Sequence, residues 1–106
     1  MSDHDYRLCA VEDVPATGGL RVEIPGRAPV AVFKSGEGFV VVDDGCTHNG
    51  ASLAKNGEVV GDAIECLWHG GLFDLRTGEV LDGPCPRPLG VHPYSAMDGA
   101  IYIKSR

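Results

Sequence analysis

The chain is built of short apolar runs separated by turn residues, and this pattern most limits what it can fold into. The runs recur at short, fairly even intervals from Tyr6 to Lys104. Such spacing predicts an all-β sandwich or barrel rather than a helical protein. The 15 glycines in 106 residues agree with this, because glycine is then roughly twice its usual share of ~7% and favours tight turns. Long helices are not expected.

The predicted strands can be given by residue range. They are Tyr6–Ala10, Gly19–Ile24, Pro29–Lys34, Phe39–Val42, Glu58–Val60, Ala63–Cys66, Leu72–Leu75, Glu79–Leu81, Val91–Tyr94 and Ala100–Lys104. A turn or short helical piece is expected over Val11–Pro15. The pattern lapses into a polar segment from Gly45 to Asn56, and further loops are expected over Leu67–Gly71 and over the proline-rich Asp82–Pro88.

Length and charge restrict the function. A chain of 106 residues supports one small core, so we expect a single domain over residues 1–106. Its formal net charge of −6 argues against binding nucleic-acid phosphates or an anionic membrane surface. The first nine residues lack a basic start and an apolar centre, and no apolar run approaches the ~20 residues of a membrane span. We therefore expect a cytoplasmic protein, whose cysteines more often bind metals than form disulfides.

Two loops each carry one cysteine and one histidine at short spacing. The first has Cys46 and His48 as C-x-H, and the second has Cys66 and His69 as C-x-x-H, with seventeen residues between His48 and Cys66. Two such loops, if they face each other, present two thiolates and two imidazoles. This set predicts a metal site, and the alternative is a group of unrelated core thiols and surface histidines.

The mixed spacing helps to choose the metal. Structural zinc sites commonly take two cysteines from one loop and two histidines from another. In this chain each loop supplies one ligand of each kind. That suits a two-iron cluster in which one iron has two cysteine ligands and the other has two histidine ligands. A structural zinc module remains the competing interpretation.

The two boxes, CTHNG over residues 46–50 and CLWHG over residues 66–70, resemble the cluster-binding boxes of Rieske iron–sulfur proteins. The run HGGLFDLRTG over residues 69–78 resembles the sequence that follows the second box in that family. The segment GPCPRP over residues 83–88 resembles the family's proline-rich loop, and DGAIYI over residues 98–103 its closing strand. The resemblance thus covers essentially the whole chain.

The resemblance implies a fold, a cofactor and ligands. It implies a Rieske fold with antiparallel sheets and a small cluster-binding lobe, over about residues 44–88, formed by the two loops. It implies one Rieske-type [2Fe-2S] cluster per chain. Cys46 and Cys66 would bind the inner iron, and His48 and His69 would bind the outer iron nearest solvent.

The sequence departs from one branch of the family. Rieske subunits of respiratory and photosynthetic complexes carry an extra cysteine in each box, where this chain has Ala51 and Trp68. Their serine after the His-Gly pair, which donates to a cluster sulfur, is Gly71 here. The chain is therefore more similar to soluble Rieske-type ferredoxins of bacterial aromatic-ring-hydroxylating dioxygenase systems.

That resemblance implies a carrier and not an enzyme. A monomer would take single electrons from an NAD(P)H-dependent flavin reductase and deliver them to a terminal oxygenase. The alternative within the family is the small Rieske-like subunit of an NAD(P)H nitrite reductase, which often lacks intact ligands.

Other residues have simpler interpretations. Cys9 is expected in the core, and Cys85 is expected to pack in the covering loop, with a redox role as its alternative. His92 is expected to be a strand or edge residue. A partly apolar rim for docking partners is expected around the histidine ligands, formed by Trp68, Leu53, Leu67 and the segment Pro84 to Pro86.

Overall fold

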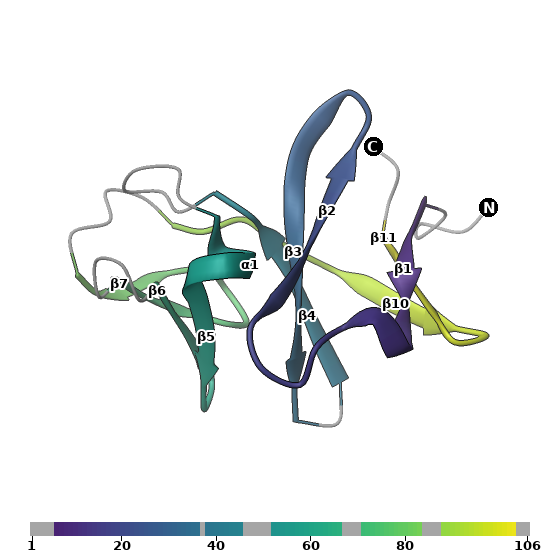
Figure 1. Cartoon of the computed structure of the whole chain (residues 1–106). Coiled ribbons are helices and arrows are strands. Elements are labelled where there is room, and N and C mark those ends of the chain that lie inside the picture. The colour runs from purple at the N-terminus through teal and green to yellow at the C-terminus, as the bar shows by residue number, and fades with distance from the viewer. Residues whose placement is uncertain (1–5, 37, 46–51, 67–70, 84–87, 104–106) are drawn as a thin grey trace.

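The computed structural model describes residues 6–36, 38–45, 52–66, 71–83 and 88–103. Nearly all of these residues lie in short strands and turns (Figure 1). The elements in chain order are β1 (Tyr6–Ala10), a short 3-10 helix (Val11–Asp13), β2 (Gly19–Ile24), β3 (Arg27–Ser35), β4 (Gly38–Asp43), α1 (Leu53–Asn56), β5 (Gly57–Val60), β6 (Ala63–Cys66), β7 (Gly71–Asp74), β8 (Val80–Asp82), β9 (Val91–His92), β10 (Tyr94–Met97) and β11 (Ala100–Ile103).

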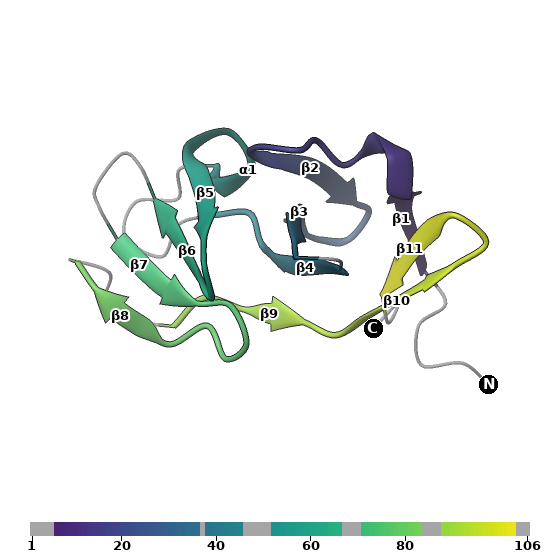
Figure 2. The same ribbon diagram turned by 90° about the horizontal axis from the view of Figure 1, so that it is seen from below.

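The described strands form three antiparallel sheets. Their orders are β1-β11-β10, β2-β3-β4-β9 and β5-β6-β7-β8. The sheet of β2, β3 and β4 stands between the other two (Figure 2). The predicted all-β class with antiparallel sheets is confirmed. No helix in the described part of the chain is long and apolar enough to cross a membrane.

The central hairpin of β3 and β4 is buried on both faces. Successive side chains of a strand point to opposite faces. Val30 and Val32 accordingly join a core shared with β1 and β11, whereas Ala31 and Phe33 join a core shared with α1, β6 and β7. This is why the sequence over these strands is continuously apolar rather than alternating. The hairpin connects the two cores of the molecule.

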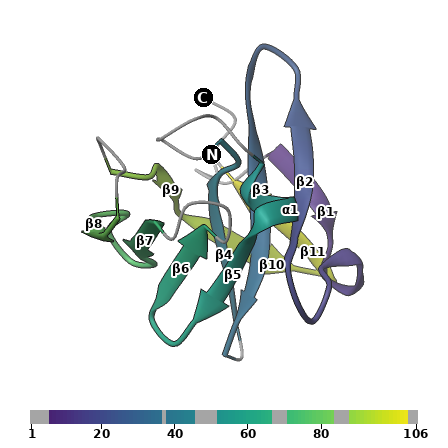
Figure 3. The same ribbon diagram turned by 60° about the vertical axis from the view of Figure 1, so that its left-hand side comes forward.

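The four-stranded sheet of β5 to β8, together with α1, forms a lobe on one side of this hairpin (Figure 3). α1 lies against β2 and β3 and leads directly into β5. The sequence predicted no helix here, because Leu53–Asn56 is short and falls in a polar segment. Leu53 and Ala54 are nevertheless buried, and they hold the helix against the central hairpin.

The predicted strand Val91–Tyr94 is wrong as a single strand. Val91 and His92 pair with β4, whereas Tyr94 begins β10, which pairs with β11. Pro93 separates them, because proline has no N–H for a strand ladder. One apolar run therefore contributes to two different sheets.

The remaining predicted strands are confirmed within one or two residues at each end, as far as the structure describes them. β3 with β4 and β7 with β8 pair as antiparallel hairpins. The hairpin of β10 and β11 turns through Asp98 and Gly99, whose φ angles are 51° and 76°. Positive φ at both central residues is what the favoured two-residue hairpin turn requires.

Candidate metal centre

Cys66 is the predicted ligand that the structure describes. It is the last residue of β6, is 0% exposed, and pairs with Gly57 of β5 on one side and Gly71 of β7 on the other. The other predicted ligands, Cys46, His48 and His69, lie outside the described residues. The ligand set therefore remains a prediction.

Both cysteine- and histidine-bearing segments start and end at antiparallel pairs. Residues 46–51 begin after Gly45 and end before Ser52, which form an isolated β-bridge with each other. Residues 67–70 begin after Cys66 and end before Gly71, which are paired in the β6–β7 register. The described residues that flank each segment are thus paired with each other.

The bases of the two segments belong to one packed unit. The chain leaves the first segment at Ser52, passes through α1, and reaches Gly57, the neighbour of Cys66 across the β5–β6 ladder. Leu53 and Cys66 are both 0% exposed and belong to the same apolar cluster. A rigid connection therefore links the start of α1 to the end of β6.

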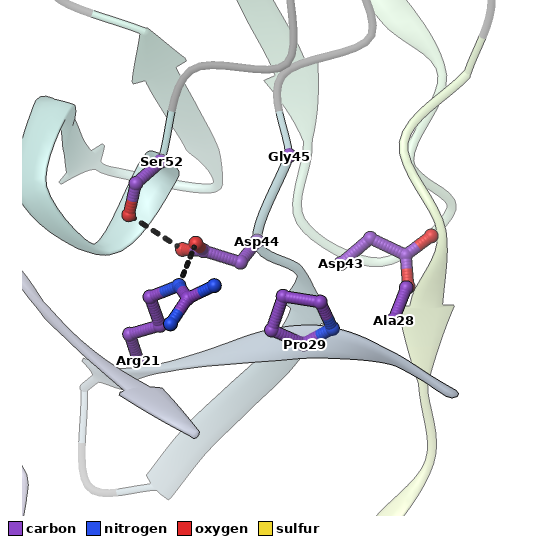
Figure 4. A pocket seen from close by; sticks show the side chains of 7 residues that line it. All are labelled: Arg21, Ala28, Pro29, Asp43, Asp44, Gly45 and Ser52. Atoms are coloured by element: carbon purple, nitrogen blue, oxygen red, sulfur yellow. Dashed lines mark hydrogen bonds and ion pairs between the residues drawn. The ribbon is translucent and has the colours of Figure 1, made fainter. Parts of the chain in front are cut away.

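A buried carboxylate closes the base of the first segment. Asp44 directly follows β4, and its side chain is 4% exposed. One carboxylate oxygen, Oδ1, accepts a hydrogen bond from the Ser52 hydroxyl at 3.0 Å (Figure 4). The same oxygen accepts from the Ala54 N–H at 2.9 Å. The other, Oδ2, accepts from Arg21 Nε at 3.1 Å, and the Asp44 carbonyl accepts from the Leu53 N–H at 2.6 Å. Asp44 thus binds the returning chain through main-chain and side-chain atoms.

The neighbouring Asp43 binds a different segment. Its N–H donates to the Gly90 carbonyl at 2.9 Å, and its Oδ1 lies 2.7 Å from His92 Nε2. Gly90 and His92 belong to the chain that returns from the proline-rich segment. His92 lies in β9, as predicted, but its carboxylate partner was not foreseen.

The turn between β7 and β8 holds the end of the proline-rich segment. The Asp74 carboxylate accepts from the N–H groups of Arg76 and Thr77 and so shapes the turn. The N–H of Leu89 then donates to the Gly78 carbonyl at 2.7 Å, and the Leu89 side chain is 2% exposed in the lobe core. The turn at Thr77 and Gly78 therefore binds the chain that follows residues 84–87.

Comparison with known proteins places this geometry in a family. The family described as "Rieske: Rieske [2Fe-2S] domain" matches residues 4–94. The chain belongs to the Rieske [2Fe-2S] domain family.

Similar proteins of this Rieske family include named ferredoxins. The chain is 40% identical over 97 residues to "Ferredoxin CarAc" of Metapseudomonas resinovorans, covering 92% of this chain and 90% of that protein. Among solved structures it resembles the "Sphingomonas yanoikuyae B1 ferredoxin" with a TM-score of 0.83 and 35% identity, covering 92% and 95% of the two chains.

A second solved structure contains a ferredoxin with its partner. It is described as the "Complex of reduced oxygenase and oxidized ferredoxin in carbazole 1,9a-dioxygenase". The matched chain has a TM-score of 0.81 and 39% identity, with 94% of this chain and 92% of that chain covered. The predicted Rieske fold is thereby confirmed.

The described part of the site fits a Rieske cluster. The Rieske arrangement needs a thiolate from each loop, and Cys66 stands at the base of the second loop, shielded from water. The residues that flank the first loop, Gly45 and Ser52, are paired with each other, and Leu53, which follows Ser52, belongs to the same apolar cluster as Cys66. The flanking strand residues, Gly57 and Gly71, have no side chains that occupy space beside the thiol.

The structure corrects the predicted docking rim. Leu53 is 0% exposed and packs in the lobe core, so it cannot belong to a surface rim. Its apolar character is explained by the α1 contact with the central hairpin. Trp68, Leu67 and the segment Pro84 to Pro86 lie outside the described residues.

Of the two cysteines that were not predicted as ligands, the structure describes Cys9. Cys9 is 6% exposed in the core of β1 and β11, which confirms its predicted place. Burial, followed by the charge of Asp13, raises the pKa of the Cys9 thiol above its ordinary value. Cys85 lies outside the described residues.

Sequence reasoning missed Asp43, Asp44 and Arg21. No role was predicted for the two aspartates, although they lie directly before Gly45 and the first box. The adjacent carboxylates at the end of an apolar strand were the available signal. Their partners lie 8 to 49 residues away in the sequence, so the pattern alone could not identify them.

Proposed function

We propose that this chain is a one-electron carrier of a bacterial aromatic-ring-hydroxylating dioxygenase system. It would hold one Rieske-type [2Fe-2S] cluster per chain, within a lobe over about residues 44–88. Cys46 and Cys66 would bind one iron, and His48 and His69 the other. The observation that carries the proposal is the buried thiol of Cys66 at the base of one Cys-His loop, in one apolar cluster with Leu53, which follows the base of the other loop.

When bound, such a cluster takes up and releases one electron at a time. Two ferric ions, two sulfides and two thiolates sum to zero charge, and reduction brings the sum to −1. The protein must therefore accommodate one added negative charge in a site that excludes water. Neutral imidazole ligands ease this step relative to four thiolates, which is why Rieske clusters have higher potentials than all-cysteine clusters.

We propose an NAD(P)H-dependent flavin reductase as electron donor and a terminal oxygenase as acceptor. The second partner is supported by the carbazole dioxygenase complex, whose ferredoxin is 39% identical to this chain. This chain would then only transfer electrons, and the aromatic substrate would bind to the oxygenase. The net charge of −6 favours basic docking surfaces on these partners.

We further propose that the protein acts as a monomer in the cytoplasm. Thiolate ligands must stay reduced to bind iron, and the cytoplasm keeps cysteines reduced. The ferredoxin relatives favour this carrier over the small nitrite reductase subunit. The family match favours iron over the structural zinc module.

The deciding experiment is analysis of the purified full chain. We expect a red-brown protein with two irons and two acid-labile sulfides per chain, and a reduced form with a low-average-g EPR signal. Cys46→Ser and His69→Ala should each abolish that signal. A colourless protein with one zinc would contradict the proposal.

A reconstituted assay then tests the partners. Electron flow from NAD(P)H through a flavin reductase to a ring-hydroxylating oxygenase should require the wild-type chain. Transfer only to a nitrite reductase would contradict the proposed system while leaving the cluster assignment intact.

A further inference from the structure

Asp44 is a charged side chain in a place where charges are costly. Of the described residues, it is the one polar or charged residue that is buried. Burying a carboxylate is tolerated only where hydrogen bonds and an opposite charge compensate. Arg21 of β2, with its side chain 39% exposed, supplies the charge through Nε at 3.1 Å. The charge of the buried carboxylate is therefore compensated. The question is what a carboxylate does at this position that a neutral side chain would not do.

The partners of the carboxylate show what it holds. Ser52 and Ala54 both donate to Oδ1, and both lie on the chain that returns from residues 46–51. Asp44 itself lies on the chain that enters this segment. The same carboxylate is thus covalently attached to one end of the segment and hydrogen-bonded to the other.

The network also fixes this loop base to the rest of the molecule. Arg21 belongs to the central sheet, and the Asp44 N–H donates to the Pro29 carbonyl of β3 at 3.1 Å. On the other side, the Ser52 carbonyl accepts from the N–H and the side-chain amide of Asn56 at the end of α1. Strands β2 and β3 and helix α1 are therefore joined at one residue, Asp44, which directly follows β4.

We propose that Asp44, with Arg21, is a positioning residue for the first pair of cluster ligands, Cys46 and His48. This inference rests on the proposed cluster. Asp44 would act by fixing both ends of the segment that carries the ligands, without contacting iron. Hydrogen bonds to a charged acceptor are roughly twice as strong as neutral ones, which explains a carboxylate at this joint.

The test compares cluster retention with overall stability. In Asp44→Asn, Oδ1 still accepts from Ser52 and Ala54, but an NH2 group faces the Arg21 N–H. Ser52→Ala removes one donor and leaves the ion pair. The purified variants are reduced, mixed with excess ferrous chelator at 25 °C, and followed by the loss of visible absorbance. We expect cluster release about tenfold faster in Asp44→Asn, the low end of the effect of residues that orient metal ligands, and a smaller increase in Ser52→Ala.

Two control variants separate positioning from general destabilisation. Val32→Ala creates a cavity in the other core, the one shared with β1 and β11, where Val32 is 0% exposed and its side chain makes no hydrogen bond to Asp44. Glu23→Gln removes the other carboxylate that pairs with Arg21. Glu23 Oε2 lies 3.2 Å from Arg21 Nη1, and the Glu23 side chain is 80% exposed. If cluster release depended on overall stability alone, it would accelerate in step with each variant's loss of stability in urea. We expect neither variant to behave in this way, and both should keep the wild-type EPR line shape. Asp44→Asn should broaden or shift that line shape.

A rescue variant tests the chemistry of the pair. The terminal atoms of glutamine are bonded to Cδ, as Arg21 Nε is, so Arg21→Gln can place a carbonyl oxygen opposite the NH2 group of Asp44→Asn. The double variant should recover most of the lost retention, because donor then meets acceptor again.

The outcomes separate this inference from the proposed function. A wild-type chain without a Rieske EPR signal would overturn both. A wild-type signal, with Asp44→Asn releasing its cluster no faster than Val32→Ala, would overturn the positioning role alone. If Asp44→Asn does not fold, Ser52→Ala decides: wild-type release and line shape would overturn the role, and faster release with a changed line shape would support it.

Discussion

Replacing Gly78 with alanine tests whether the turn between β7 and β8 seats the chain after the proline-rich segment. Gly78 has a φ of +79°, and a Cβ at this position would overlap the carbonyl oxygen of Leu89. Gly26 offers a matched control, since its φ is +78° and no atom lies within 4 Å of its Cβ position. The two substitutions share the backbone cost and differ in the collision.

The magnitude follows from these contacts. An alanine in the left-handed region costs about 1–2 kcal/mol, and this is the full expected effect of Gly26→Ala. Gly78→Ala adds the hydrogen bond from Leu89 N–H at 2.7 Å, about 1 kcal/mol, which is lost when Leu89 moves. Displacing the buried Leu89 side chain adds about 1–3 kcal/mol. We therefore expect Gly78→Ala to destabilise the protein by about 3–6 kcal/mol.

The assay is urea unfolding followed by far-UV circular dichroism, with the cluster absorbance recorded in parallel. The unfolding midpoint of Gly78→Ala should fall well below that of Gly26→Ala, and the visible spectrum should change in the former only. Equal midpoints for the two variants would refute the steric argument, because the difference between them isolates the contact with Leu89.

Three further outcomes are expected. The midpoint potential should lie at the low end of the Rieske range, roughly −150 mV to zero, because Gly71 supplies no hydroxyl donor; potentiometric titration measures it, and a value well above zero contradicts the reasoning. Because the pKa of the Cys9 thiol is raised in the folded protein, its contribution to the free energy of unfolding is fully present below pH 9.0 and is lost as the pH rises further. Urea midpoints of the wild type from pH 8 to 11 should therefore fall more steeply than those of Cys9→Ala, and parallel profiles would contradict this expectation. A double-mutant cycle of Asp43→Ala and His92→Ala at pH 7 should give a coupling of about 0.5–3 kcal/mol, and additive losses would mean that their 2.7 Å contact contributes nothing.

The fold was predictable where local pattern and packing agree. Turn glycines and short apolar runs place β1, β2 and β6 at their observed bounds. The pattern failed at Pro93, because an apolar run does not reveal that its two halves pair with different sheets. It also failed at α1, a helix of four residues stabilised by burial of Leu53 and not by its own periodicity.

The candidate site was predictable only as a set of residue types. Cys66 stands out in the sequence because the second box repeats the chemistry of the first. Asp44 does not stand out, because its structural role depends on hydrogen bonds with Arg21 and Ala54, which lie 23 and 10 residues away. Hydrogen bonds of this kind leave no periodic signal, so a buried carboxylate looks like any surface aspartate until the chain is folded.

The adjacent carboxylates explain how a small chain can align segments that are distant in sequence. Consecutive side chains near a strand end point to opposite sides, and Asp43 and Asp44 do so (Figure 4). Asp44 therefore binds the return of residues 46–51, while Asp43 binds the return of residues 84–87 through Gly90 and His92. Both anchors sit at the end of a hairpin that is buried on both faces. Because this hairpin cannot shift without disturbing both cores, the described residues that follow the two segments are held on one common support.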